Sequence, residues 1–153
     1  MTAVLQIVNH ATVYADGVLS GATGRGLYIL LGVGDSDTEE DVRLLAEKIP
    51  KLRIFSDENG KMNLSVTDIG GEALVVSNFT LCANYSHGNR PDYFSAAKPD
   101  IANRLYELFV TMLSEKVKKV ATGKFGADMR TEMSTNGPVT IVMESELLKK
   151  KNS

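Results

Sequence analysis

The chain of 153 residues is poor in the residue types on which many site chemistries depend. A single cysteine, Cys82, excludes an intramolecular disulfide and a thiolate cage for a metal ion. The two histidines, His10 and His87, are far apart and fit no His-x-x-x-His or Glu-x-x-His pattern, so we expect no metal site. Apolar runs stay well short of the roughly 20 residues that span a bilayer, and the first residues lack a basic signal segment. We therefore expect a cytoplasmic protein with no membrane partner.

Two motifs for phosphate binding or catalysis are incomplete. The glycine-rich segment 21–26 lacks the Lys-Ser/Thr pair of a phosphate-binding loop, and no helical pattern follows it. Ser77 and His87 could join an acid in a catalytic triad, but no Gly-x-Ser-x-Gly elbow surrounds Ser77. The net charge of −2 argues against broad electrostatic binding of nucleic acid and leaves a local contact open.

The period of the apolar residues switches between two and about 3.6, which indicates both strands and helices. We expect two short strands at 3–9 and 11–15, with a hairpin turn at Asp16-Gly17. Further strands are expected at 27–33, 53–55, 72–81, 129–133 and 139–143. One helix should begin at the capping box Ser36–Glu39 and end near Ile49, before Pro50. A second helix should follow the apolar stripe from Ile101 to Val117.

These elements predict a single α+β domain over residues 1–148, followed by a lysine-rich tail at 149–153. Mixed and antiparallel sheets should form a barrel-like core with the two main helices packed against it. Residues 82–98 are polar and contain Gly88 and Pro91, so they should form a long loop, and long loops in compact domains are often functional.

Two short segments place backbone-exposing or hydroxyl residues where strands usually bury side chains. The first is Asn136-Gly137-Pro138, in which Gly137 lacks a Cβ and Pro138 lacks an N–H, so the pair can aim carbonyl oxygens into a pocket. A simple turn is the alternative for that pair. The second is Ser77-Asn78-Phe79-Thr80, in which Thr80 could equally be an ordinary strand residue.

Seven segments, in order along nearly the whole chain, form a recognisable set: Leu30–Val33, Arg53–Asp57, Gly60–Asn63, Val75–Leu81, Gly88–Pro91, Phe125–Met129 and Asn136–Thr140. With these segments the chain resembles the D-aminoacyl-tRNA deacylase family. The resemblance implies a hydrolase of D-aminoacyl-tRNA that needs no metal or organic cofactor. It also implies a homodimer, in which the Ser77–Thr80 segment of one subunit and the Gly-Pro motif of the other bind the 3′-terminal aminoacyl-adenosine.

The resemblance also assigns roles to individual residues. It implies that Thr80, Ser77 and Phe79 are catalytic and that Asn78, Gly137, Pro138 and Met129 bind the substrate. In the family the Gly-Pro bond is cis, and its carbonyls would exclude L-amino acids while glycine would be accepted. Thr80 would position water or substrate, or act as the nucleophile, with backbone N–H groups near Phe79 as oxyanion donors.

The sequence departs from the family pattern in three places, one of which is a pair of residues. Asn78 stands where the family has glutamine, Ile7 where it usually has arginine, and Thr135-Asn136 where Asn-Asp is usual. Related deacylases that tolerate some L-aminoacyl-tRNAs also carry Thr-Asn-Gly-Pro, but they lack the Ser-x-Phe-Thr segment. Two alternatives therefore stay open: a relaxed deacylase of mischarged L-aminoacyl-tRNA, and a protein that binds the tRNA end without turnover.

Overall fold

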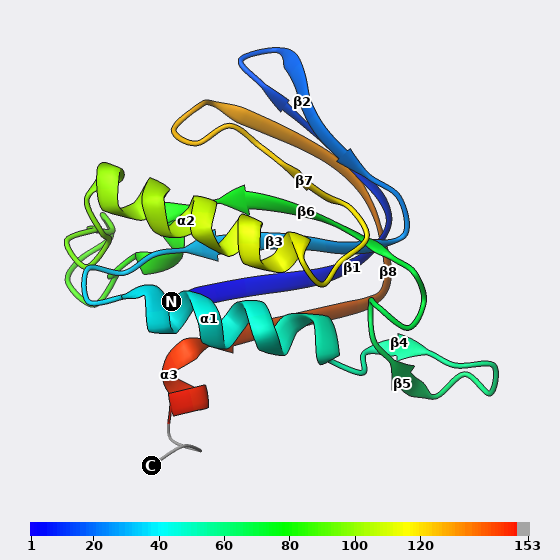
Figure 1. The fold of residues 1–153 in the computed structure, drawn as a ribbon. Helices are drawn as coiled ribbons and strands as arrows, with labels where there is room; N and C mark the ends of the chain where they lie inside the picture. The colour runs from blue at the N-terminus through cyan, green and yellow to red at the C-terminus, as the bar shows by residue number, and fades with distance from the viewer. Residues whose placement is uncertain (150–153) are drawn as a thin grey trace.

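One strongly curled sheet of six strands dominates the computed structural model of the chain, which describes residues 1–149 (Figure 1). The strand order is β2-β1-β3-β6-β7, and β8 pairs with the other edge of β1. β3 pairs in parallel with β6 and β6 with β7, whereas β1 pairs antiparallel with all of its neighbours. The strands are β1 (Thr2–Ala15), β2 (Val18–Thr23), β3 (Gly26–Gly32), β6 (Glu72–Ser77), β7 (Val120–Thr122) and β8 (Met129–Glu144). The predicted α+β barrel-like core is confirmed.

β1 is one strand of 14 residues and not the two short strands expected. Its first half pairs with β3 and its second half with β2, while β8 follows its other edge from end to end. The predicted hairpin turn at Asp16-Gly17 is confirmed, and both residues have positive φ, 51° and 82°. At the far side of the curl, the Ser20 hydroxyl donates to the Thr122 carbonyl over 3.1 Å, which ties β2 to β7.

Alternation along the strands divides the core between the two faces of the sheet. Leu27, Ile29 and Leu31 of β3 face the helices, in one cluster with apolar residues of α1 and α2. Tyr28 points to the opposite, inner face of the curl, where it joins a smaller cluster with Val76. The inner face is thus only partly filled, which leaves space for a pocket beside Tyr28 and Val76.

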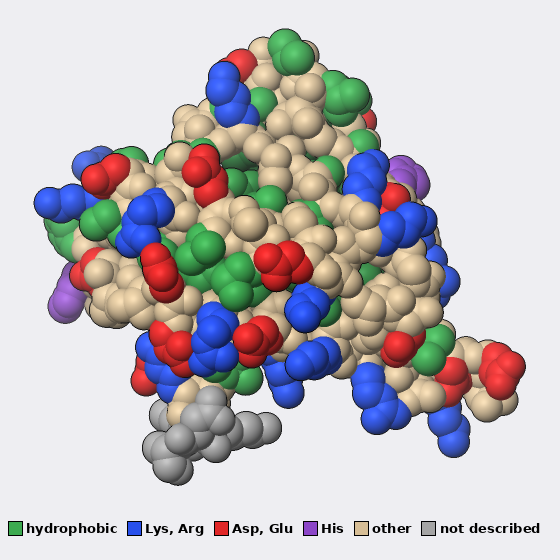
Figure 2. Space-filling view, viewed as in Figure 1, with side chains coloured by type: hydrophobic (Ala, Val, Ile, Leu, Met, Phe, Trp, Pro, Cys, Tyr) green, Lys and Arg blue, Asp and Glu red, His purple; other side chains and the backbone are tan. Residues whose placement is uncertain are grey.

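Two main helices, α1 (Glu39–Lys48) and α2 (Pro99–Ser114), pack against the sheet as predicted, and both lie on the same face of it (Figure 1). The capping box of α1 is formed by Thr38 and Asp41, not by Ser36 and Glu39 as the sequence suggested. Ile49, Pro50 and Lys51 continue as the short 3₁₀ helix η1. Acidic and basic side chains are interleaved over the face that carries the helices (Figure 2).

The remaining elements are short. β4 (Phe55–Ser56) and β5 (Met62–Leu64) form a separate antiparallel pair, two residues later than the strand expected at 53–55. The helix α3 (Ser145–Lys149) follows β8, so Lys149, assigned to a tail from sequence, ends this helix and pairs with Asp41 over 2.9 Å. The rest of the predicted tail, 150–153, lies outside the described residues. Within residues 1–149, no helix has the length and apolarity needed to cross a membrane.

Candidate active site

A pocket of about 800 Å³ opens where β6 ends, on the inner face of the curled sheet. Ser77, Asn78 and Phe79 of the predicted site line it one after another, and Met129 at the start of β8 lines it from across the curl. Four of the seven residues predicted for the site therefore meet in one cavity. Apolar side chains form most of the wall, among them Leu30, Val33, Val76 and Phe125.

The segment expected to continue β6 to Leu81 instead leaves the sheet at Ser77 and forms the 3₁₀ helix η2 (Phe79–Cys82). Asn78 is the N-cap of η2, and its extended backbone donates from N–H to the Leu31 carbonyl over 2.9 Å. An asparagine at this position ends a strand naturally, because its side chain can satisfy the first free N–H groups of a helix. The change of direction carries Phe79 and Thr80 out of the sheet.

Asn78 and Thr80 are joined by two hydrogen bonds to one atom. Oδ1 of Asn78 accepts the backbone N–H of Thr80 at 3.2 Å and the Thr80 hydroxyl at 2.5 Å. Thr80 is not among the residues that line the pocket. Its hydroxyl is linked to the pocket indirectly, by its hydrogen bond to Asn78, which does line it. The N–H of Phe79, at the first position of η2, has no acceptor within that helix and remains suited to an oxyanion.

Phe79 lies at the mouth of the pocket with 58% of its surface exposed. Its ring meets that of Tyr93 edge to face, with centroids 5.1 Å apart and planes at 74°. This is a favoured arrangement for two aromatic rings, and it restricts the orientation of the Phe79 ring although much of the ring is exposed to solvent. An exposed, fixed aromatic ring is a surface on which a nucleic-acid base or a ribose can pack.

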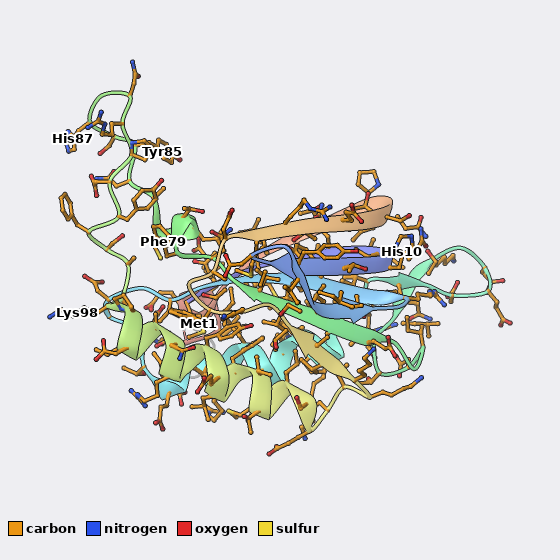
Figure 3. The ribbon with its side chains drawn as sticks, turned by 90° about the horizontal axis from the view of Figure 1, so that it is seen from above. Met1, His10, Phe79, Tyr85, His87 and Lys98 are labelled. Carbon is orange, nitrogen blue, oxygen red and sulfur yellow. The ribbon has the colours of Figure 1, made fainter. Side chains whose placement is uncertain are left out.

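The long loop predicted at 82–98 projects from the body of the molecule, with Phe79 at its base and Tyr85 and His87 at its outer end (Figure 3). A bridge between Asn84 and Asp92 closes the outer part into an arm. His87 is therefore remote from Ser77, and His10 lies at the opposite end of the sheet (Figure 3). The structure does not bring the residues of a serine triad together, and residues 1–149 contain no group of three potential metal-ligating side chains.

Gly137 and Pro138 do not line the pocket of their own chain. They lie in β8, which is one strand of 16 residues and not the two strands expected. Gln6 pairs with Thr140 and Val8 with Thr135, so the single β1 residue Ile7 faces the four β8 residues 136–139. The Gly-Pro motif is thus an exposed bulge in a continuous strand.

The bulge is fixed by the side chains on either side of it. The Gln6 amide donates to the Thr140 hydroxyl over 3.3 Å, and the Asn136 amide donates to Oδ1 of Asn9 over 3.4 Å. The Gly137–Pro138 peptide is cis, and Gly137 has a φ of 118°, which strongly favours glycine. Ile7, which faces the bulge from β1, is buried with 7% exposure.

Sequence reasoning missed several residues of the pocket. Tyr28 and Thr131 lie on its inner side, where their hydroxyls are 3.0 Å apart, and Lys98 lies at its rim beside the start of α2 (Figure 3). A signal for Tyr28 was present, because successive side chains of the strand predicted at 27–33 point to opposite faces, which sets Tyr28 opposite Leu27 and Ile29. Thr131 could be found in the same way, because it lies two residues after Met129 in the strand predicted at 129–133 and so on the same face. No comparable signal identifies Lys98.

The pocket is chemically sparse. Among the lining residues within 1–149, Lys98 is the only one with a side chain that is charged at neutral pH. Cys82 of η2 is half-buried, and burial raises the pKa of its thiol, so it is poorly suited to act as a thiolate nucleophile. The arrangement can bind a flat, largely apolar group and present backbone and amide donors beside it, and it leaves the nucleophile to water or to the substrate.

Known proteins are similar to this chain along nearly its entire length. The family model described as D-Tyr-tRNA(Tyr) deacylase matches residues 4–144. The D-aminoacyl-tRNA deacylase of Anaeromyxobacter dehalogenans is 52% identical over 148 residues, which cover 97% of this chain and 99% of that protein. The protein of the same name from Parabacteroides distasonis is 51% identical, over 95% of this chain and 98% of its own.

Solved structures share the fold. One described as the c-Myc DNA Unwinding Element Binding Protein is 39% identical and superposes with a TM-score of 0.88, covering 94% of this chain and 98% of that one. A probable eukaryotic D-amino acid tRNA deacylase, 17% identical, has the same fold with a TM-score of 0.80, over 94% of this chain and all of its own length, 100%. The chain therefore belongs to the D-aminoacyl-tRNA deacylase family and is a hydrolase that acts on an ester bond.

Proposed function

We propose that this protein hydrolyses D-aminoacyl-tRNA in the cytoplasm, releasing the free D-amino acid and the tRNA. The observation that carries the proposal is the pocket at the end of β6, where Ser77, Asn78, Phe79 and Met129 of the family's motifs line one cavity. A cavity of about 800 Å³ is ample for the terminal aminoacyl-adenosine. The net charge of −2 fits recognition of the tRNA end better than recognition of its whole surface.

The substrate is placed with its ester beside η2. Phe79 packs on the ribose or the base, and Met129 contacts the base from the opposite wall. Ser77 and Asn78 hold the ester group between the end of β6 and the start of η2. Lys98 at the rim faces the region where the phosphate of the terminal nucleotide enters, which favours an anionic substrate.

Hydrolysis at this site uses groups that need no metal or organic cofactor. Water attacks the ester carbonyl carbon, negative charge develops on the carbonyl oxygen, and the bond to the ribose oxygen breaks as that oxygen takes up a proton. The N–H of Phe79 stabilises the charge, and Thr80, tied to Asn78, positions the reacting groups rather than attacking. The neighbouring 2′-hydroxyl of the terminal ribose assists the proton transfer.

Selection of the D-ester is assigned to Gly137 and Pro138 of a second copy of the chain. The bulge that carries them is exposed and lies outside the pocket of its own chain, so a homodimer is required to place it over η2. Their backbone would occupy the space that an L-side chain needs, and main chain fixed in a sheet cannot rotate away. Glycine has no side chain to reject, so glycyl-tRNA is also a substrate.

The two alternatives make different predictions for a single experiment. Purified protein is incubated with D-Tyr-tRNA, L-Tyr-tRNA and Gly-tRNA, and loss of each ester is followed over time. We expect loss of the D-tyrosyl and glycyl esters with the L-tyrosyl ester intact. Loss of the L-ester at a comparable rate would instead identify a relaxed deacylase, and tRNA binding without loss of any ester would identify a binding protein.

A further inference from the structure

We propose that the hydroxyl pair of Tyr28 and Thr131 recognises the polar edge of the terminal adenine of the tRNA. The inference rests on the proposed function, because it takes the tRNA end as the occupant of the pocket. It assigns specificity to two residues that lie on the inner side of the cavity, away from η2.

The hydroxyl pair exists only because the sheet is curled. Tyr28 of β3 pairs with Gln6 of β1, whereas Thr131 of β8 pairs with Val13, seven positions further along β1. Both side chains point to the inner face of the curl, and their oxygens meet at 3.0 Å. Tyr28 is 5% exposed and Thr131 is half-buried, so the pair is held by packing on both sides.

The pair has hydrogen-bonding capacity that its own contact does not use. Each hydroxyl has one proton and two lone pairs, and the bond between them, in which either oxygen can be the donor, consumes one proton and one lone pair. One O–H donor and an adjacent acceptor remain. Burial raises the pKa of Tyr28, so its proton is retained at neutral pH.

Adenine presents the complementary pattern. Its N7 accepts a hydrogen bond and the neighbouring N6 amino group donates one. The walls around the pair are apolar, including Leu30, Val76 and Met129, so a base buried there would otherwise lose its bonds to water. The hydroxyl pair restores one acceptor–donor contact at the inner end of the pocket.

The position of the pair favours the base over the amino-acid side chain. Leu31 pairs with Ser77 beside η2, and Tyr28 lies three residues before Leu31, roughly 10 Å away along the strand. A nucleoside can reach from an ester at η2 to this depth. The terminal adenine is also the same on every tRNA, so a fixed donor–acceptor pair can match it in every substrate. The side chain of the esterified amino acid varies, and glycine has none for the pair to contact.

The test compares two ligands that differ only at N6. Wild type, Tyr28→Phe and Thr131→Val are titrated with adenosine 5′-monophosphate and with purine riboside 5′-monophosphate, which lacks the amino group. Wild type should bind the adenine nucleotide about tenfold more tightly, the effect of about one hydrogen bond, and each variant should lose this preference. Tyr14→Phe makes the same chemical change on β1 outside the pocket and should retain it.

Kinetics with D-Tyr-tRNA and D-Ala-tRNA complete the test. Each pocket variant should raise KM about tenfold for both esters with kcat little changed, provided that its melting temperature matches wild type. Unchanged adenine preference and KM in both folded variants would overturn the inference. A variant that alters the preference between D-tyrosyl and D-alanyl esters, and not the preference between nucleotides, would also overturn it, because the pair would then face the amino-acid side chain of the substrate.

Absence of hydrolysis by wild type would refute the proposed function, and the nucleotide titration would still decide whether the pair contacts adenine.

Discussion

The hydroxyl of Thr80 donates to Oδ1 of Asn78 over 2.5 Å, and the backbone N–H of Thr80 donates to the same oxygen. Because a backbone N–H can only donate, its partner must be the amide oxygen, which fixes the orientation of the Asn78 side chain. The only proton of the Thr80 hydroxyl is then engaged. Thr80 can offer lone pairs to water or substrate, but within residues 1–149 the side-chain partner of its hydroxyl is the amide of Asn78, which is not a base that could make it a nucleophile.

Replacing Thr80 by valine therefore tests positioning against nucleophilic attack. Thr80→Val keeps the shape and removes the hydroxyl, so we expect kcat for D-Tyr-tRNA to fall roughly tenfold, the effect of about one hydrogen bond, and not to vanish. Thr80→Ser, which restores the hydroxyl, should keep most of the rate. Single-turnover kinetics with mass spectrometry checks both; an acyl-enzyme on Thr80, or complete loss of turnover in Thr80→Val alone, would contradict the positioning role.

Phe79 should contribute to binding more than to the chemical step. Its ring is exposed and held by Tyr93, and packing of a base or ribose on such a ring contributes about 1–3 kcal/mol. We expect Phe79→Ala to raise KM for D-Tyr-tRNA at least fivefold with a smaller change in kcat, and Phe79→Tyr to stay near wild type. Steady-state kinetics decides; a fall in kcat with KM unchanged would show that the ring supports the reaction geometry instead.

Asp41 should make stability depend on pH. Although burial raises its pKa, hydrogen bonds from Ser145 and Lys149, and from the backbone of Thr38, hold that pKa far below the ordinary value. The unfolded chain takes up the proton near pH 4 and the folded chain does not, so the stabilisation is complete above that pH and is lost as the pH falls below it.

Urea unfolding of Asp41→Asn measures this stabilisation. We expect the variant to be about 2 kcal/mol less stable than wild type at pH 7, because the buried carboxylate loses its charge and its hydrogen bonds from Ser145 and the half-exposed Lys149 weaken, and the difference to shrink at pH 3. Asp100→Asn, an exposed change in the first turn of α2, serves as the control and should differ little at either pH. A difference that stays constant from pH 7 to pH 3 would show that Asp41 acts through packing alone.

Local patterns in the sequence predicted most of the fold, because they reflect forces that act within a few residues. The Asp16-Gly17 turn, the buried strand β3 and the stripe of α2 each follow from backbone freedom or apolar period. The continuity of β1 and β8 could not be predicted in this way. Each strand carries residues that suggest a break, and pairing along the full length of its partner overrides them.

The candidate site shows the same division. Its motif residues could be found in the sequence, but the path of the chain through them could not, since Phe79 and Thr80 leave the sheet where Asn78 caps η2. The contact between Tyr28 and Thr131 depends on the curl of the sheet, a property of all six strands together. Likewise, only the three-dimensional arrangement shows that Gly137 and Pro138 lie outside the pocket of their own chain.

The central claim, a site formed by η2 of one copy and the Gly-Pro bulge of another, can be tested by mixing two variants. Thr80→Val removes the hydroxyl that η2 contributes to the site. Gly137→Ala distorts the bulge, because a Cβ there would lie 2.9 Å from the Val139 backbone nitrogen and Gly137 has a φ of 118°. Each variant alone should hydrolyse D-Tyr-tRNA more slowly than wild type while remaining folded and dimeric, with a cooperative thermal transition even if the strain in Gly137→Ala lowers its midpoint.

Unfolding and refolding the two variants together at equal concentration should give half mixed dimers, each with one fully intact site. Sites shared between copies would then restore about a quarter of the wild-type rate above the residual rates of the two variants. That recovery, measured as loss of ester from D-Tyr-tRNA, is the result we predict. A mixture that shows only the average of the two variant rates, with mixed dimers demonstrated by mass spectrometry, would contradict a shared site.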